Sequence, residues 1–464
     1  MSHAIARHNG GVSHWYAATA LPTRRAPLPG DRSADVCIVG AGFTGLWSAY
    51  YLKRARPDLE VVVLEREFAG FGASGRNGGW LTSEFAASRE QVARDHGRDA
   101  VIALQRAMQG AVDEVIAVAA RESIDADIVK RGVLHVARGP VQLQRMHAML
   151  ADDRRWGLGP DDMRELSVAE LAGRLRVTRA SGALFSPHAA RVQPAKLVQG
   201  LAAAVERLGV TIYEGTTASE VVPGARAVTD RGTVTAPTVL VCLEGFTASL
   251  RGRRRDWVPL NSALVATEPL DAATWEQIGW EGSELLGDGA HAYMYAQRTA
   301  DGRIAFGGRG VPYRFGSRTD VGGRTQQRTI DQLAALLCEF FPVLERATLD
   351  HAWCGVLGVP RDWSPTVRFD RASGIGTAGG YVGSGVATSN LAGRTLSGLV
   401  LGEASELTAL PWVGRSPRRW EPEPLRFIGA HLVYALYRAA DRREAAGLRR
   451  TSRLADVASR LAGR

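Results

Sequence analysis

The first part of the chain alternates short apolar runs with one amphipathic segment. Residues 36–39 and 61–64 are continuous apolar runs, which are typical of parallel strands buried on both faces. Between them a glycine-rich break opens a helical pattern over residues 44–56, which Pro57 ends. These elements predict one βαβ unit of about 30 residues.

Helical spacing and strand-like runs continue along the chain. The spacing predicts helices over residues 87–122, 194–208 and 386–400, the second with a proline in its first turn. Apolar runs predict strands at residues 132–136, 211–213, 227–229 and 238–242. From residue 258 to residue 341 the pattern alternates and contains aromatic residues, as in an antiparallel sheet with a trailing helix.

Together these patterns predict an α/β protein with a discontinuous nucleotide-binding domain. We place this Rossmann-type domain at residues 34–90, 188–257 and 346–405. A second, α+β domain with a mixed or antiparallel sheet is expected at residues 91–187 and 258–345, and a basic helical tail at residues 415–464. The cleft between the two domains is the expected substrate site.

Composition narrows the class of protein. The 464 residues are 45% hydrophobic and 23% charged, values of a globular protein rather than a fibrous or disordered one. No apolar run approaches the roughly 20 residues of a membrane span, and residues 1–11 lack the apolar core of a signal peptide, so we expect a cytoplasmic protein. The four cysteines follow neither a disulfide nor a metal-ligand spacing, and no metal site is expected: Cys37, Cys242, Cys338 and Cys354.

The positive charge gathers in the tail. The net charge is +9, and residues 415–464 hold twelve arginines against five acidic residues. Apolar residues recur there at helical spacing, so we expect a helix that packs on the body through Leu425, Ile428, Leu432 and Leu436. The alternative is peripheral contact with an anionic membrane surface. No nucleic-acid motif accompanies the charge, so no nucleic-acid partner is expected.

The glycine-rich break after the first strand carries the clearest motif. Gly40, Gly42 and Gly45 form the pattern G-x-G-x-x-G between a strand and a helix. The first glycine permits the tight turn, the second lets the backbone approach a pyrophosphate, and the third allows helix and strand to pack closely. Glu65 ends the second strand, 20 residues beyond Gly45, where an acid accepts hydrogen bonds from ribose hydroxyls. The motif predicts a bound dinucleotide.

Two further glycine-rich segments suggest a large planar ligand. Residues 72–79 read GASGRNGG, with Arg76 and Asn77 as donors among the glycines. Residues 379–385 read GGYVGSG and open the helix at Val386. The positive end of that helix dipole would favour a negative charge on a ligand bound there.

These stretches are similar to the FAD-dependent amine and amino-acid oxidase superfamily, the D-amino acid oxidase-like proteins, and within it to the gamma-glutamylputrescine oxidase-like branch. The resemblance runs from about residue 14 to residue 402 and is carried by DVCIVGAGFTGL (35–46), GASGRNGG (72–79), DGRIAFGG (301–308) and YVGSGV (381–386). It implies FAD as the cofactor. The expected FAD contacts are Gly40, Gly42, Thr44, Gly45, Glu65, Arg66, Gly72, Ala73, Ser74, Arg76, Asn77, Gly78, Val222, Tyr381, Gly383, Ser384, Gly385 and Val386.

Two departures from the family bear on the chemistry. Sarcosine oxidase-like members attach the flavin to a cysteine, but Gly355 falls at that position and Cys354 one residue earlier, so we expect FAD without a covalent link. Some members use a lysine to promote reaction with oxygen. The three lysines, Lys53, Lys130 and Lys196, are not clearly placed for this role, which leaves oxygen or another electron acceptor open.

The substrate side is less specified. Candidate catalytic residues are Arg76, Tyr293, Tyr295 and Trp353; the aromatic rings either bind an amine by cation–π contact or pack in the core. A substrate carboxylate would need an arginine such as Arg76, Arg298 or Arg309, whereas His188 and His291 are expected to be structural.

The expected reaction is the oxidation of a carbon–nitrogen bond in a small amine or amino acid. Hydride passes to the flavin, and the resulting imine hydrolyses. The alternatives are a flavin-dependent hydroxy-acid dehydrogenase or hydroxylase, and a dinucleotide-binding module without turnover.

Overall fold

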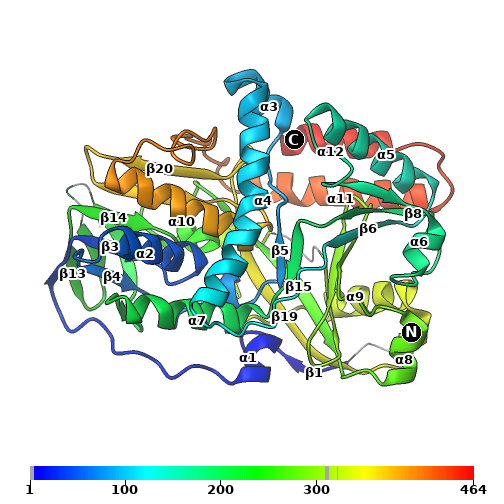
Figure 1. Ribbon diagram of the computed structural model, residues 1–464, viewed down its shortest axis with the longest axis horizontal. Coiled ribbons are helices and arrows are strands. Elements are labelled where there is room, and N and C mark those ends of the chain that lie inside the picture. Colours follow the sequence, from blue (N-terminus) through cyan, green and yellow to red (C-terminus); the bar gives the residue numbers. More distant parts are fainter. Residues whose placement is uncertain (1–4, 223, 225, 309–312, 321, 464) are drawn as a thin grey trace.

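The computed structural model describes residues 5–222, 224, 226–308, 313–320 and 322–463 (Figure 1). A six-stranded sheet and a nine-stranded sheet lie in the left and right halves of the view, and the long helix α4 (Arg98–Arg121) runs between them. The α/β class, with one Rossmann-type sheet and one mixed sheet, is confirmed.

The six-stranded sheet is built from three distant parts of the chain. Its order is β10 (Thr211–Tyr213), β4 (Val61–Leu64), β3 (Val36–Val39), β14 (Thr238–Val241), β21 (Ile375–Gly379) and β20 (Thr366–Asp370). All neighbours are parallel except β20, which runs antiparallel to β21. Parallel neighbours need long crossover connections, which is why the pieces are far apart in sequence.

Both faces of this sheet are covered, as the unbroken apolar runs predict. Val36 and Ile38 pack in a helix-covered core, and Cys37 and Val39 pack on the opposite face. The helices are α2 (Phe43–Ala55), α4, α7 (Pro194–Arg207) and α10 (Gly385–Leu401). The opposite face meets a four-stranded sheet of β11 (Ala218–Val222), β12 (Arg226–Thr229), β13 (Gly232–Thr235) and β2 (Arg32–Ser33).

The nine-stranded sheet is mixed. Its order is β1 (Ala6–Asn9), β19 (Leu349–Val359), β15 (Val258–Thr267), β18 (Ile304–Gly308), β17 (Met294–Arg298), β16 (Leu285–Asp288), β6 (Val133–Ala137), β8 (Gly182–Ser186) and β7 (Arg164–Leu166). Helix α9 (Gln327–Phe340) packs on one face through Leu333 and Leu337. Shorter elements join or cover these sheets: α1 (His14–Thr19), α3 (Arg89–His96), α5 (Pro140–Arg155), α6 (Val168–Ala172), α8 (Ala272–Ile278) and the pair β5 (Trp80–Thr82) and β9 (Ala189–Arg191).

Two details differ from the sequence pattern. The helix expected over residues 87–122 is two helices, because Gly97 takes a φ of +87° between α3 and α4. Strand β19 lies in the segment 346–405 but pairs with β15 of the nine-stranded sheet, so this segment contributes to both sheets. The domain bounds themselves stay a prediction.

The tail packs on the body through an unexpected face. Helices α11 (Leu425–Ala445) and α12 (Arg453–Ala462) share a hydrophobic cluster with the body of the protein. Helix α11 contributes Val433, Tyr437 and Ala440 to it. The expected contact through Leu425, Ile428 and Leu432 is wrong, since these side chains are 61%, 57% and 48% exposed. The helix carries apolar residues on two faces, and the face with the aromatic ring and smaller side chains is the one that is buried. Leu436 is partly buried against the same cluster.

None of the helices in the described part of the chain combines the length and the apolar composition that a bilayer crossing requires.

Candidate functional site

One large cavity lies between the two sheets. Its walls come from the β3–α2 turn, residues 71–78, residues 216–219, residues 242–246, strands β15, β17 and β19, and the start of α10. All three glycine-rich segments expected from the sequence therefore open into one space. This convergence comes from parallel strands, whose carboxyl ends meet at one edge of the sheet.

The β3–α2 turn needs its glycines for steric reasons. Gly40 has a φ of +108°, and a Cβ there would lie 2.7 Å from the carbonyl oxygen of Cys242. A Cβ on Gly45 would lie 2.0 Å from the oxygen of Gly40, so Gly45 serves the packing of the helix and does not line the cavity. Gly42 does line the cavity and precedes the first turn of α2. The positive end of the α2 dipole thus faces the cavity, as in anion-binding turns.

Glu65 follows β4 at the same edge of the sheet. Its carboxylate accepts hydrogen bonds from the backbone N–H groups of Ala41 and Glu67, both at 3.0 Å. Burial raises its pKa, and the two N–H donors oppose that shift. Arg66 also lines the cavity, with its guanidinium carbon 5.3 Å from the ring centre of Phe246. The acid stands where a ribose is expected to bind.

The second glycine-rich segment is fixed by its own polar groups. Ser74 Oγ accepts from the N–H of Phe43 at 2.8 Å, which joins this segment to the first turn. The Asn77 amide donates to the carbonyls of Ala73 and Ser74. Arg76 is 1% exposed and donates to the carbonyl of Phe71 at 2.7 Å. Its guanidinium carbon lies 4.3 Å from the ring centre of Phe71. These residues all line the cavity.

The third segment is tied to the first across the cavity. The hydroxyls of Tyr381 and Thr44 are hydrogen-bonded at 2.9 Å, and burial raises the pKa of Tyr381 further above its usual range. Gly383, with a φ of +109°, and residues 384–386 line the cavity at the start of α10. A second helix N-terminus therefore faces the same space.

Sequence reasoning missed a buried acid in this wall. Glu244 accepts from the N–H groups of Gly380 at 3.1 Å and Tyr381 at 3.0 Å, and also from that of Gly358. Burial raises its pKa to about 7 despite these donors. It links the loop after β14 to β19 and to the third segment. The only signal in the sequence is an acid that follows a buried strand after two intervening residues, Cys242 and Leu243.

Another part of the cavity wall, next to the second and third glycine-rich segments, is aromatic and polar. Tyr293 and Tyr295 both line it, and the Tyr295 hydroxyl is hydrogen-bonded to Ser262 at 2.8 Å. Trp80 lies edge-on to Tyr295 with 6.0 Å between ring centres. Glu84 also lines this part and pairs with His135 at 3.0 Å. Trp80, Glu84 and His135 escaped sequence analysis because no spacing connects them.

Several expected residues lie elsewhere. Trp353 is fully buried, is absent from the cavity lining, and donates its indole N–H to the carbonyl of Arg76 at 2.9 Å. Val222 in β11 does not line the cavity either. Arg298 packs 4.1 Å from the ring of Trp275, and Arg309 lies outside the described residues. His188 pairs with Asp162 at 3.0 Å.

Neither the cysteine nor the lysines considered from the sequence reach the cavity wall. Gly355 lines the cavity, whereas the Cys354 thiol donates to the carbonyl of Arg324 at 3.4 Å, and burial raises its pKa to about 11. The lysines are hydrogen-bonded outside the lining: Lys53 to the carbonyls of Pro57 and Leu59, Lys130 to Asp113, and Lys196 to Asp127.

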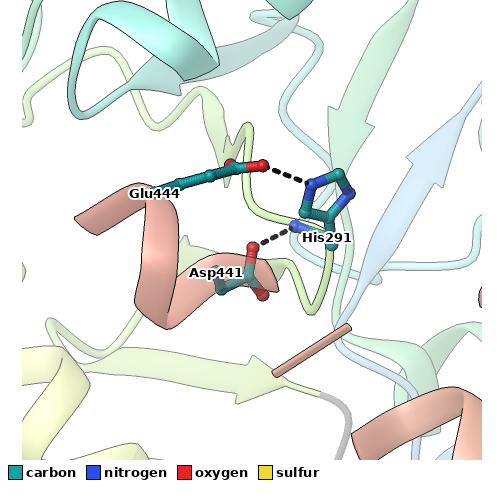
Figure 2. Close-up of side chains that lie close together, drawn as sticks. All are labelled: His291, Asp441 and Glu444. Atoms are coloured by element: carbon teal, nitrogen blue, oxygen red, sulfur yellow. Dashed lines mark hydrogen bonds and ion pairs between the residues drawn. The ribbon is translucent and has the colours of Figure 1, made fainter. Parts of the chain in front are cut away.

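The tail contacts the segment that precedes Tyr293. Figure 2 shows Asp441 and Glu444 of α11 facing His291. Asp441 accepts from the N–H groups of His291 at 2.9 Å and Ala292 at 3.0 Å, and His291 Nε2 lies 3.0 Å from Glu444. Arg145 lies 2.6 Å from the other oxygen of Glu444. Because the Arg145 guanidinium already supplies a positive charge, His291, Asp441 and Glu444 form a hydrogen-bonded contact rather than a cation site.

Comparisons with known proteins agree with this geometry. A family model described as "FAD dependent oxidoreductase" (DAO) matches residues 35–399. The chain is 30% identical over 402 residues to a probable oxidoreductase, OrdL, of Rhizobium meliloti, covering 85% of this chain and 90% of that protein. It is 29% identical over 409 residues to the gamma-glutamylputrescine oxidoreductase of Escherichia coli, covering 86% and 91%.

A solved structure has the same fold. Glycine oxidase from Geobacillus kaustophilus superposes with a TM-score of 0.68 at 20% identity, covering 81% of this chain and 96% of that one. The resemblance drawn from the glycine-rich motifs is thereby confirmed, and the enzyme belongs to the DAO family of FAD-dependent oxidoreductases.

Proposed function

We propose that this enzyme binds FAD without a covalent link and oxidises a carbon–nitrogen bond of a small amine or amino acid. The observation that carries the proposal is the continuity of the cavity. It begins at the dinucleotide cradle of Gly42 and Glu65 and ends at an aromatic wall with Tyr293 and Tyr295.

The residues present fit FAD. Gly42 and the start of α2 suit the pyrophosphate, and Glu65 suits the ribose hydroxyls. The start of α10 at Gly385 presents N–H groups and positive potential at the other end of the cradle. Bound there, FAD supplies an acceptor for two electrons and a proton, which the side chains of this chain do not provide.

The protein's own contribution is to bind, orient and dehydrate the amine. Tyr293, Tyr295 and Trp80 surround its carbon skeleton and keep out water. The substrate reacts as the neutral amine, since only a free lone pair stabilises the iminium that forms when hydride leaves the neighbouring carbon. The imine product then takes up water and gives a carbonyl compound and an amine or ammonia.

The position of Cys354 supports a non-covalent cofactor. Its thiol bonds to Arg324 and does not line the cavity, and Gly355 forms the wall at this point of β19. Reoxidation of the enzyme then requires oxygen or another acceptor such as a quinone. Stopped-flow reoxidation with each acceptor assigns the carrier.

A peripheral membrane contact is the second role that we propose for the tail. The exposed residues Leu425, Ile428 and Leu432 form one stripe of α11, and the exposed Arg442 and Arg443 follow on the same helix. Apolar side chains beside arginines favour an anionic lipid surface. Co-sedimentation with phosphatidylserine vesicles tests this, and binding should fall when the three apolar residues are changed to serine.

Anaerobic reduction of the bound flavin tests the reaction. Amines or amino acids should bleach the flavin absorbance, with a rate that rises with pH as the substrate ammonium loses its proton. Deuterium on the carbon next to nitrogen should slow the bleaching. Reduction by hydroxy acids alone would instead identify a hydroxy-acid dehydrogenase, reduction by NAD(P)H would point to a hydroxylase, and a flavin that no substrate reduces would leave a binding module.

A further inference from the structure

We propose that Glu84 anchors a second positive charge of the substrate, so that the preferred substrates are diamines or amines with a distal cationic group. This inference rests on the proposed amine oxidation and adds the substrate class. It starts from a carboxylate that lies in the cavity wall next to the aromatic rings.

Strand β5 and His135 hold Glu84 next to the aromatic residues of the cavity wall. It follows strand β5 by two residues, and Trp80 and Thr82 of that strand also line the cavity. Its side chain is 47% accessible, although protein surrounds it, because it borders the cavity. His135 of β6, at 16% accessibility, holds one carboxylate oxygen at 3.0 Å from Nε2. A carboxylate accepts several hydrogen bonds, so the second oxygen can receive a substrate ammonium.

His135 keeps the Glu84 carboxylate in its charged form. Burial alone would raise the pKa of Glu84, but the hydrogen bond and charge of His135 outweigh burial and lower it. The same contact raises the pKa of His135 against the effect of burial. Glu84 is therefore ionised at neutral pH. His135 pairs with one carboxylate oxygen only, so a substrate ammonium can bind at the other oxygen.

The surrounding groups suit a cation and disfavour an anion. The Trp80 ring centre lies 6.0 Å from that of Tyr295 and 6.5 Å from that of His135. Aromatic faces attract ammonium groups, and desolvation strengthens the attraction. Among described lining residues the arginines are Arg66 and Arg76, which pack on Phe246 and Phe71. A substrate carboxylate next to Glu84 would meet a like charge.

The test compares α,ω-diamines with monoamines of the same carbon number, by anaerobic bleaching of the holoenzyme. We expect the wild-type enzyme to prefer the diamine by at least about tenfold in the second-order rate constant of flavin reduction, since a hydrogen bond to a charged group contributes on this scale. Glu84→Gln should remove most of this preference by raising the apparent Kd for the diamine more than for the monoamine. Glu84→Asp, which keeps the charge, should retain part of it.

Glu165→Gln is the matched control. Glu165 pairs with His147 at 2.8 Å with similar exposure, outside the cavity lining, and its change should leave the preference intact. Equal bleaching by monoamines and diamines in the wild-type enzyme would overturn the inference, even if Glu84→Gln does not fold. An equal loss for both substrate types in Glu84→Gln would also overturn it. Absence of bleaching by every amine would instead refute the proposed function.

Discussion

Changing Asp441 to asparagine tests whether the tail positions Tyr293. The Asp441 carboxylate accepts the N–H groups of His291 and Ala292, directly before Tyr293 in the chain. On the other side, Asp288 accepts the N–H of Met294 at 3.0 Å. Two carboxylates thus fix the ends of the short segment that carries the cavity-lining ring of Tyr293.

The size of the effect follows from the two hydrogen bonds. Asparagine keeps one acceptor oxygen and turns an NH₂ group toward the other N–H, so at least one charge-assisted bond is lost. Such a bond contributes about 1.5–3 kcal/mol. If the segment that carries Tyr293 then occupies its bound position only part of the time, apparent substrate affinity falls by the competent fraction. We expect KM for the amine to rise about three- to tenfold, with kcat and FAD affinity changed less.

The assay is steady-state oxidation of the best amine together with FAD titration of the apoprotein. Asp456→Asn serves as the control, because it removes the same charge from the same tail at an exposed position in α12. A lower melting temperature for Asp441→Asn with an unchanged KM would refute the reasoning, because the contact would then stabilise the tail without positioning Tyr293.

Three further predictions follow from the cavity wall. Gly42→Val should weaken FAD binding at least about tenfold, because the new side chain would enter the cavity with its Cβ 3.0 Å from Ser74 Oγ. The melting temperature of the apoprotein should change little. Gly45→Ala should instead lower the melting temperature, since its Cβ would lie 2.0 Å from the backbone oxygen of Gly40. Acid precipitation should release FAD into the supernatant, and yellow colour retained in the pellet would contradict the placement of Cys354. Burial raises the pKa of Glu244 to about 7, so folding favours the protonated carboxyl. The resulting stabilisation is fully present below the unfolded-state pKa near 4.5 and is lost as the pH rises through 7. The loss in the free energy of unfolding is at most about 3 kcal/mol. Denaturant unfolding of apoprotein at pH 5 and pH 8 should therefore show a smaller loss of stability for Glu244→Gln than for wild type, and equal losses would contradict the shift.

Much of the fold was predictable because its signals are local. A continuous apolar run predicts a strand covered on both faces, and Val36 and Cys37 do face two different cores. The tail was harder, because α11 has apolar residues on two faces, and helical spacing alone does not decide between Leu432 and Val433. That choice depends on the body surface against which the helix packs. The break at Gly97 was missed because a single glycine is tolerated inside a helix, and only its φ of +87° in the structure separates α3 from α4.

Two parts of the cavity wall differ in the same way. Gly40 and Glu65 lie within one βαβ unit, so spacing along the chain places both at the same edge of the sheet. His135 and Tyr295 come from β6 and β17, which strand β16 separates and joins, and no sequence interval encodes that pairing.

Strand β5 links the second glycine-rich segment to Glu84. It leaves that segment at Trp80 and ends two residues before Glu84, while pairing with β9 holds its direction. If the proposed FAD site is right, a shift of the glycine-rich segment would therefore also move Glu84. Because so few residues separate the two, we expect the spacing between bound flavin and the distal ammonium of a substrate to be nearly constant. Substrate length, and not charge alone, should then decide which diamine is oxidised fastest.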